Sequence, residues 1–295
     1  MRLWVTGARG FIGRHLVAQA ALAGHEVWAI DRDDRDGEPM PQGIRLLPLD
    51  VGDAARVETC VQESSPEAIV HLAWYASPQD YLTSPHNVES LAATLTLART
   101  ALLFGCPKML AVGTCLEYAE RSTRRIESDP LDPKSLYARC KRAAHLVLEE
   151  FFERAGASLT WARLFHMHGP GEHPARLIPS LAKALREGRP FALSAGEQLR
   201  DHLDVRDVAS ALLHLLGCAV KGPVNVCSGQ PVTLRAVVEA VAHECGRPEL
   251  LRLGERPYAE NEIMNLTGDP GRLMQTGWRP AHTDLARSLH DELSM

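Results

Sequence analysis

The sequence predicts an α/β protein with a doubly wound parallel sheet and a smaller C-terminal cap. Short apolar runs alternate with helical patterns over residues 1–170, and this alternation with short turns is typical of a parallel sheet covered by helices on both faces. Beyond Pro170, helical patterns are separated by short strands and by loops that contain Pro and Gly. We therefore assign residues 1–170 to a sheet domain and residues 171–295 mainly to a cap, with about residues 200–226 returning to the sheet domain.

The composition limits the class of protein. The chain has 295 residues, of which 45% are hydrophobic and 23% charged, and its net charge is −5. We expect a sizeable core and no nucleic acid as partner. The seven cysteines are odd in number and lack CxxC spacing, and the histidines form no close pair on a helix face. We therefore expect no metal site and a cytoplasmic setting. Because no signal-peptide pattern and no run of membrane-spanning length are seen, no membrane association is expected.

A glycine-rich turn follows the first apolar run. Residues 3–6 read as a strand, residues 7–13 hold three glycines, and a helical pattern continues to Ala23. Such glycines let the backbone turn tightly and approach a pyrophosphate, which the helix N-terminus attracts. The next strand-like run, residues 27–30, ends in Asp31, at the spacing where a carboxylate can accept the ribose hydroxyls of an adenosine. The pattern predicts a dinucleotide site.

Asp31 and Arg32 point to different forms of that dinucleotide. A carboxylate at Asp31 repels a 2′-phosphate and favours NAD(H). Arg32 follows at once, and a guanidinium there can pair with the same phosphate. We expect NAD(H) as the favoured cofactor and keep NADP(H) as the alternative.

Further strands and helices complete the predicted sheet. Strand-like runs lie at residues 44–49, 68–73, 109–112 and 159–165, and helical patterns at residues 54–63, 87–104, 137–152, 175–187, 205–216, 234–244 and within 279–295. Ligands of such sheets bind outside the carboxyl ends of the strands. The residues found at these ends are therefore expected to converge on one crevice: Asp31, Asp50, Ala73, Thr114 and His166.

Tyr137 and Lys141 lie four residues apart on a predicted helix. Positions i and i+4 share a helix face, so the phenol and the ammonium can meet. A lysine beside a phenol favours the phenolate, and we expect it to lower the pKa of Tyr137. A Tyr with such a pKa can donate or accept a proton near neutral pH.

Together these motifs resemble the extended short-chain dehydrogenase/reductase family, the group of nucleotide-sugar epimerases, dehydratases and ketoreductases. The resemblance runs nearly from end to end. It rests on Thr6-Gly7-x-x-Gly10-Phe11-Ile12-Gly13, Asp50-Val51, His71-Leu72-Ala73, Asn87-Val88, Thr114 ahead of Tyr118, Tyr137-x-x-x-Lys141, Gly169-Pro170-Gly171, the stretch 200–209, Val224-Asn225-Val226 and Gly277-Trp278.

The resemblance implies a Rossmann domain that binds NAD(P), a cap that binds a nucleotide-diphosphate sugar, and a homodimer formed through the helices at 87–104 and around Tyr137. It implies that Tyr137 is the general acid/base, that Lys141 lowers its pKa and binds the nicotinamide ribose, and that Thr114 hydrogen-bonds the reacting oxygen. The implied cofactor contacts are Gly7, Arg9, Gly10, Phe11, Ile12, Gly13, Asp31, Arg32, Asp50, Val51, Leu72, Ala73, Trp74, Tyr137 and Lys141. The implied substrate contacts are Tyr75, Thr114, Cys115, His166, Arg176 and Arg200, of which Arg200 matches the family's phosphate-binding Arg.

Departures from the family pattern discriminate among reactions. The family's 4,6-dehydratases have Asp-Glu after the catalytic Thr, whereas this chain has Cys115 and Leu116. Glu117 lies one residue later and, in an extended segment, would face the other way. The family's 4-epimerases often have Asn where this chain has His166.

The predicted reaction is therefore the NAD(P)H-dependent reduction of the 4-keto group of a nucleotide-linked 4-keto-6-deoxy sugar. The segment 74–78 is also similar to that of sugar 4-ketoreductases. Two alternatives stay open: an NAD-dependent nucleotide-sugar 4-epimerase, and a bifunctional epimerase/reductase that uses Cys115 and His173. A non-catalytic dinucleotide sensor is disfavoured because Thr114, Tyr137 and Lys141 are all present.

Overall fold

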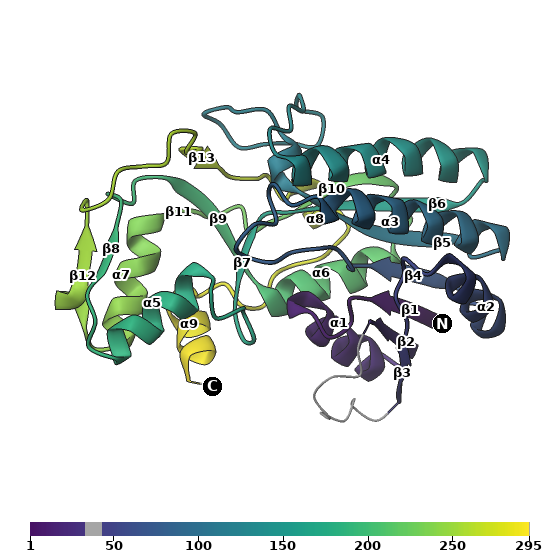
Figure 1. The fold of residues 1–295 in the computed structure, drawn as a ribbon, viewed down its shortest axis with the longest axis horizontal. Coiled ribbons are helices and arrows are strands. Elements are labelled where there is room, and N and C mark those ends of the chain that lie inside the picture. Colours follow the sequence, from purple (N-terminus) through teal and green to yellow (C-terminus); the bar gives the residue numbers. More distant parts are fainter. Residues whose placement is uncertain (33–42, 295) are drawn as a thin grey trace.

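The computed structural model describes residues 1–32 and 43–294, and it confirms the predicted fold class (Figure 1). Within these residues, parallel strands form a central sheet in the order β10-β6-β5-β4-β1-β2-β3. The order reverses between β1 and β4, and ligands of such sheets bind at this switch point. The strands are β1 (Arg2–Thr6), β2 (Glu26–Asp31), β3 (Ile44–Pro48), β4 (Ala68–His71), β5 (Lys108–Thr114), β6 (Ser158–Leu164) and β10 (Gly222–Val226).

Helices cover both faces of this sheet. On one face α1 (Phe11–Leu22) packs against α6 (Val205–Gly217), and on the other α2 (Ala54–Ser64), α3 (His86–Leu103) and α4 (Leu136–Arg154) lie in series. Alternate side chains of β1 enter the two cores: Leu3 and Val5 pack under α1 and α6, while Trp4 packs under α2 and α3. This alternation is the period of a strand buried on both faces.

The cap is built mainly from the C-terminal part of the chain. Its apolar core lies between α5 (Leu177–Arg186), α7 (Leu234–Glu244) and α9 (Leu285–Leu293). Two small sheets flank it, one of β8 (Phe191–Leu193) and β12 (Leu251–Leu253), the other of β7 (His166–His168), β9 (Leu199–Asp204), β11 (Pro231–Thr233) and β13 (Asn265–Leu266). Short helical turns lie at η1 (Cys115–Glu117), η2 (Pro248–Leu250) and α8 (Gly271–Met274).

Two helices begin later than predicted, because their N-cap residues determine where the helical backbone starts. The helix expected from residue 175 begins at Leu177, because Arg176 keeps an extended backbone as its N-cap. The last helix begins only after Asp284, whose side chain accepts hydrogen bonds from the backbone N–H groups of Ala286 and Arg287. Within residues 1–32 and 43–294, no helix combines the length and the apolar character that a membrane crossing requires.

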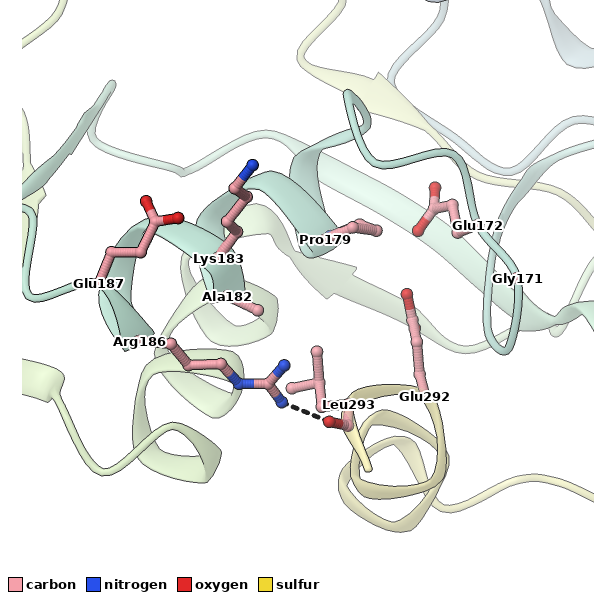
Figure 2. Close-up of a pocket in the computed structure, with 9 residues that line it drawn as sticks. All are labelled: Gly171, Glu172, Pro179, Ala182, Lys183, Arg186, Glu187, Glu292 and Leu293. Atoms are coloured by element: carbon pink, nitrogen blue, oxygen red, sulfur yellow. Dashed lines mark hydrogen bonds between the residues drawn. The ribbon is translucent and has the colours of Figure 1, made fainter. Parts of the chain in front are cut away.

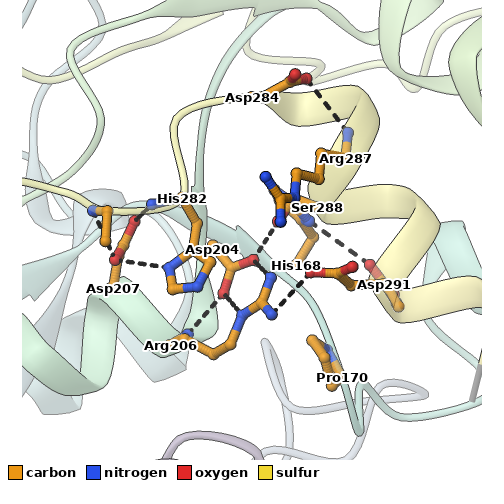
Figure 3. A network of polar contacts seen from close by, with 12 residues as sticks. His168, Pro170, Asp204, Arg206, Asp207, His282, Asp284, Arg287, Ser288 and Asp291 are labelled. Atoms are coloured by element: carbon orange, nitrogen blue, oxygen red, sulfur yellow. Dashed lines mark hydrogen bonds and ion pairs between the residues drawn. The ribbon is translucent and has the colours of Figure 1, made fainter.

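A polar network fixes the C-terminal segment to the start of α6 (Figure 3). Asp204 caps α6 and accepts from the Nε of Arg206 at 2.9 Å, and Arg206 also pairs with Asp291 of α9 at 2.9 Å. One turn later, Asp207 accepts from the backbone N–H of His282 at 2.7 Å and contacts its Nδ1 at 3.0 Å. These charge-assisted contacts hold α9 against the sheet domain.

A pocket of about 380 Å³ lies between α5 and α9 (Figure 2). Glu172 and Glu292 point toward one another at one end of it. Burial, and next the charge of Glu292, raise the pKa of Glu172 to about 8. The Nδ1 of His168 lies 3.5 Å from the Glu292 carboxylate, whose side chain is only 4% exposed. None of the residues that line this pocket is among the predicted site residues.

Because of this carboxyl pair, we expect the folded protein to lose stability at alkaline pH. The folded-state pKa of Glu172 lies above the unfolded value, so its contribution is fully present below about pH 4.5 and is lost as the pH rises through about 8. We expect Glu172→Gln to be more stable than the wild type at pH 9, by an unfolding free energy on the order of 1–3 kcal/mol. The measurement is denaturant unfolding at several pH values.

Glu187→Gln is the matched control, because Glu187 lines the same pocket but is exposed and has a pKa lowered by the hydrogen bond from Arg189. Its stability should follow the wild-type pH dependence. Parallel profiles for Glu172→Gln and the wild type would contradict the assignment.

Candidate active site

The glycine turn between β1 and α1 requires its glycines. Gly7 has φ +68°, a conformation that side chains with a Cβ rarely adopt. A Cβ at Gly13 would lie 2.1 Å from the carbonyl oxygen of Gly7, and one at Gly7 would lie 3.0 Å from the backbone nitrogen of Ala73. The N-cap, Gly10, offers no side-chain cap to α1. Its first-turn N–H groups are therefore suited to an anion, and the cradle fits a dinucleotide pyrophosphate.

Asp31 stands beside this turn, at the end of β2. Its carboxylate accepts from the backbone N–H of Arg9 at 3.0 Å and from that of Arg32 at 2.9 Å. These bonds fix the carboxylate against the glycine turn, where an adenosine ribose would be held. Asp50 follows β3 and accepts from the backbone N–H of Gly52 at 2.8 Å, while Val51 is buried.

A hydroxyl–imidazole pair anchors the end of β4. The Thr6 hydroxyl lies 2.8 Å from Nδ1 of His71 and accepts from the backbone N–H groups of Leu72 and Ala73, each at 3.2 Å. Burial lowers the pKa of His71 to about 3, so the imidazole is neutral. These contacts place Leu72 and Ala73 against the glycine turn. In the sequence, the motif His71-Leu72-Ala73 contributed only to the family resemblance and did not indicate this contact.

The structure brings Thr114, Tyr137 and Lys141 together. Thr114 ends β5, and Tyr137 and Lys141 lie on the first turns of α4. The Thr114 side chain lies close enough to the Tyr137 phenol to act on its pKa, which it lowers. The ammonium of Lys141 donates to the carbonyl oxygen of Val112 at 2.8 Å and lies 3.8 Å from the centroid of a Trp74 ring.

Burial controls the protonation of this group. It raises the pKa of Tyr137 above its ordinary value, and Tyr81 and Cys115 add to the rise. It lowers the pKa of Lys141 to about 7, with Glu117 acting in the opposite direction. The expected lowering of the Tyr137 pKa by Lys141 is therefore not found, because desolvation of the phenol raises this pKa and the charges of Tyr81, Cys115 and Glu117 act in the same direction. The Tyr137 phenol is therefore protonated at neutral pH.

Aromatic rings surround Tyr137. The ring centroids of Tyr81 and Trp74 lie 5.1 and 6.4 Å from that of Tyr137, both nearly edge-on. The guanidinium of Arg176 lies 4.9 Å above the Tyr81 ring, a cation–π contact. Tyr75 instead packs against His86 at the start of α3, with ring centroids 4.8 Å apart, and its hydroxyl donates to Asp80 of the preceding loop at 2.8 Å. Tyr81 and Arg176 thus join the wall of the site through a contact that sequence spacing does not encode.

Arg200 already has partners within the cap. It pairs with Glu262 at 2.5 Å and donates to the carbonyl oxygen of Ile263 at 2.7 Å. Burial raises the pKa of Cys115 to about 12 and lowers that of His166 to about 3. Nδ1 of His166 is buried without a hydrogen-bond partner in the described residues.

Glu117 differs from its expected conformation. The segment after β5 is not extended but forms the turn η1, and the Glu117 side chain is fully buried. Its carboxylate lies in the core, where it contacts Trp161 and Arg163. A signal was present in the sequence: Thr-x-x-Glu is the pattern of a capping box, and Thr114 and Glu117 form one.

Comparison with known proteins extends the match over the whole chain. The model of the NAD dependent epimerase/dehydratase family matches residues 3–227. A GDP-6-deoxy-D-mannose reductase of Pseudomonas aeruginosa is 30% identical, over 99% of this chain and 96% of its own. A UDP-glucose 4-epimerase of Corynebacterium glutamicum is 25% identical, over 99% and 94%. The crystal structure of Thermus thermophilus UDP-glucose 4-epimerase in complex with NAD has a TM-score of 0.89 and 27% identity, over 100% of this chain and 98% of that one.

The family model thus spans both the glycine turn and the three residues gathered around Tyr137, and the relatives cover the chain from end to end. The chain belongs to the NAD-dependent epimerase/dehydratase family, the extended short-chain dehydrogenases/reductases.

Proposed function

We propose that the protein reduces the 4-keto group of a nucleotide-linked 4-keto-6-deoxy sugar, with NAD(H) as the favoured cofactor and NADP(H) as the alternative. The carrying observation is the half-buried, protonated Tyr137, which lies next to Thr114 and beside a dinucleotide cradle. A carbonyl under reduction needs a proton donor at its oxygen, and Tyr137 is that donor. Cys115 and Leu116 stand where a dehydratase needs two acids.

Each residue of the proposed site has a distinct task. A dinucleotide held by the glycine turn and Asp31 would supply the hydride when bound in its reduced form. Thr114 orients the carbonyl oxygen, and Tyr137 transfers its phenolic proton to that oxygen as negative charge develops there. Protonated Lys141 then stabilises the phenolate until solvent returns the proton. Because the pKa of Lys141 lies near 7, both its charged and its neutral form are present at neutral pH.

Arg176 and Arg200 are the proposed contacts of the substrate diphosphate. A guanidinium matches phosphate geometry in a bidentate manner. Arg176 lies over Tyr81, next to Tyr137, and Arg200 carries a charge that reaches both Cys115 and His166. Arg200 would exchange its pairing with Glu262 for the diphosphate. The GDP-sugar reductase of Pseudomonas aeruginosa supports a nucleotide sugar as substrate.

The second candidate is a nucleotide-sugar 4-epimerase. The full-length likeness to the Thermus thermophilus and Corynebacterium glutamicum epimerases favours it, since the same three residues can catalyse oxidation and then reduction. The bifunctional alternative has less support. With a pKa near 12 the Cys115 thiol stays protonated, and the exposed His173 accepts from the backbone N–H of Ala175.

The first test supplies NADH or NADPH with an NDP-4-keto-6-deoxyglucose and follows the absorbance of the reduced cofactor and the configuration of the product. We expect one cofactor to be oxidised per sugar reduced, with NADH the better of the two, because a carboxylate at Asp31 repels a 2′-phosphate. A parallel reaction with UDP-glucose and NAD tests the epimerase. Interconversion of two sugars without net cofactor oxidation would replace the reductase by the epimerase.

Tyr137→Phe removes only the proposed proton donor. We expect turnover to fall on the order of 10²–10⁴-fold, the usual contribution of a general acid, while NADH affinity stays within about threefold of the wild type. Fluorescence titration measures that affinity. Tyr81→Phe is the control, because it keeps the ring that packs on Tyr137. Retained activity in Tyr137→Phe would remove Tyr137 from the reaction.

We further propose a homodimer formed through α3 and α4. These helices pack against each other on one face of the sheet (Figure 1). They expose large apolar side chains that a solvated surface does not need. Val88 and Leu103 of α3 are 54% and 65% exposed, and Leu146, Val147 and Phe151 of α4 are 51%, 50% and 38% exposed.

The double variant Leu146→Glu, Phe151→Glu should convert this dimer into a monomer, because it buries two carboxylates in an apolar interface. Light scattering coupled to gel filtration measures the mass. Leu22→Glu is the control, since Leu22 is 90% exposed on α1, over the opposite face of the sheet. A monomeric wild type would contradict the proposal.

A further inference from the structure

Glu117 makes contacts that reach the backbone of Thr114. One carboxylate oxygen, Oε1, accepts from the backbone N–H of Thr114 at 2.9 Å and from Nε1 of Trp161 at 3.0 Å. The Thr114 hydroxyl in turn accepts from the backbone N–H of Leu116 at 3.3 Å. The two ends of the turn that begins at Thr114 are thus joined by reciprocal side chain–backbone hydrogen bonds, as in a capping box.

The space above Gly113 is shaped for this carboxylate. A Cβ at Gly113 would lie 2.2 Å from Nε1 of Trp161 and 2.4 Å from Oε1 of Glu117. The two polar groups therefore press directly on the backbone that precedes Thr114. Only a residue without a side chain leaves room for them.

A buried cation holds the carboxylate from the other side. Nε of Arg163 donates to Oε2 of Glu117 at 3.0 Å, and both side chains are at most 2% exposed. Arg163 also donates to the hydroxyl of Tyr118 at 3.1 Å, and that hydroxyl donates to Asn225 at 2.6 Å. The ion pair is thereby fixed to β5, β6 and β10. Such a pair contributes little net stability compared with apolar packing, so another role has to account for it.

The charge of Glu117 also acts on Lys141. Burial lowers the pKa of Lys141 to about 7, and the negative charge of Glu117 opposes that effect. Of the other titratable groups near this pair, His71 and His145 are kept neutral by burial, which lowers the pKa of each to about 3. The guanidinium of Arg163 faces Glu117 from β6, and the Tyr137 phenol stays protonated.

We infer that Glu117 is a positioning residue for the proposed reduction, because its buried carboxylate fixes the backbone of Thr114 and supports the positive charge of Lys141. It touches neither sugar nor cofactor. It acts through Thr114, which orients the reacting oxygen, and through Lys141, which stabilises the Tyr137 phenolate. The inference rests on the roles proposed above for these three residues.

Two substitutions separate the two parts of this role. Glu117→Gln removes the charge and retains an acceptor for the Thr114 N–H. Glu117→Asp retains the charge and withdraws it by one methylene from that N–H. For Glu117→Asp we expect kcat to fall roughly 10- to 100-fold, as for a small misplacement of a catalytic group, with an unchanged pH profile. We expect kcat/KM to fall at alkaline pH as Lys141 loses its proton. In Glu117→Gln the pKa of Lys141 should be lower, so this fall should occur at a pH lower by about one unit.

Arg163→Gln provides a shift of opposite sign. It removes the cation that faces Glu117 and leaves the buried carboxylate as the uncompensated charge, so the pKa of Lys141 should rise and the alkaline loss should move to higher pH. A role in folding alone would not move the profile in opposite directions. Circular dichroism and NADH binding establish that each variant is folded.

Lysine NMR tests the inference without any reaction. The protein is labelled at the lysine Cε, and the resonance that disappears in Lys141→Met is assigned to Lys141. The pH titration of this resonance should move to lower pH in Glu117→Gln and should stay at the wild-type position in Glu117→Asp. Unchanged titration in both Glu117→Gln and Arg163→Gln, together with wild-type kcat in Glu117→Asp, would overturn the inference. If the wild type proved inactive as a reductase, the proposed function would fail while this titration still decided the role of Glu117 toward Lys141.

Discussion

Burial of the Lys141 ammonium under the Trp74 ring sets the chemistry of the site. An ammonium removed from water loses its hydration, and its pKa falls toward neutrality unless nearby groups replace the lost contacts. The carbonyl of Val112, the face of Trp74 and the charge of Glu117 are those replacements. The same burial keeps the Tyr137 phenol protonated, so a donor and a responsive cation stand side by side.

The direction of these shifts bears on the reaction. A reductase starts its cycle with a protonated donor at the carbonyl oxygen, whereas an epimerase starts by removing a proton from a hydroxyl. A phenol with a raised pKa is ready for the first task, whereas for the second it has to become a phenolate, which the Lys141 ammonium would stabilise. The arrangement around Tyr137 thus supports reduction, while the likeness to full-length epimerases supports the alternative.

Much of the fold could be predicted because its signals are local. Apolar periodicity marked the strands, and the glycine turn and the Tyr137–Lys141 spacing need only neighbouring residues to be read. What escaped prediction depends on distant partners. Glu117 meets Arg163, which lies 46 residues away in the sequence, and Arg200 meets Glu262, which lies 62 residues away. The sign of the Tyr137 shift was wrong in prediction because spacing shows a neighbouring charge but does not show how deeply the phenol is buried.

The Thr114–Glu117 turn shows how a local pattern and a distant partner combine. Thr-x-x-Glu alone predicts only a capped turn. With Arg163 and Trp161 behind it, the same Glu places a full charge against the backbone N–H of Thr114, and this charge raises the pKa of Lys141. An apolar residue at position 117 would avoid desolvating a carboxylate. It would, however, leave the N–H of Thr114 and the indole N–H of Trp161 without their acceptor, and the buried guanidinium of Arg163 without its counter-charge. The cost of burying the pair is therefore offset by a fixed Thr114 turn and a stabilised Lys141 ammonium, the two features that the proposed proton transfer by Tyr137 requires.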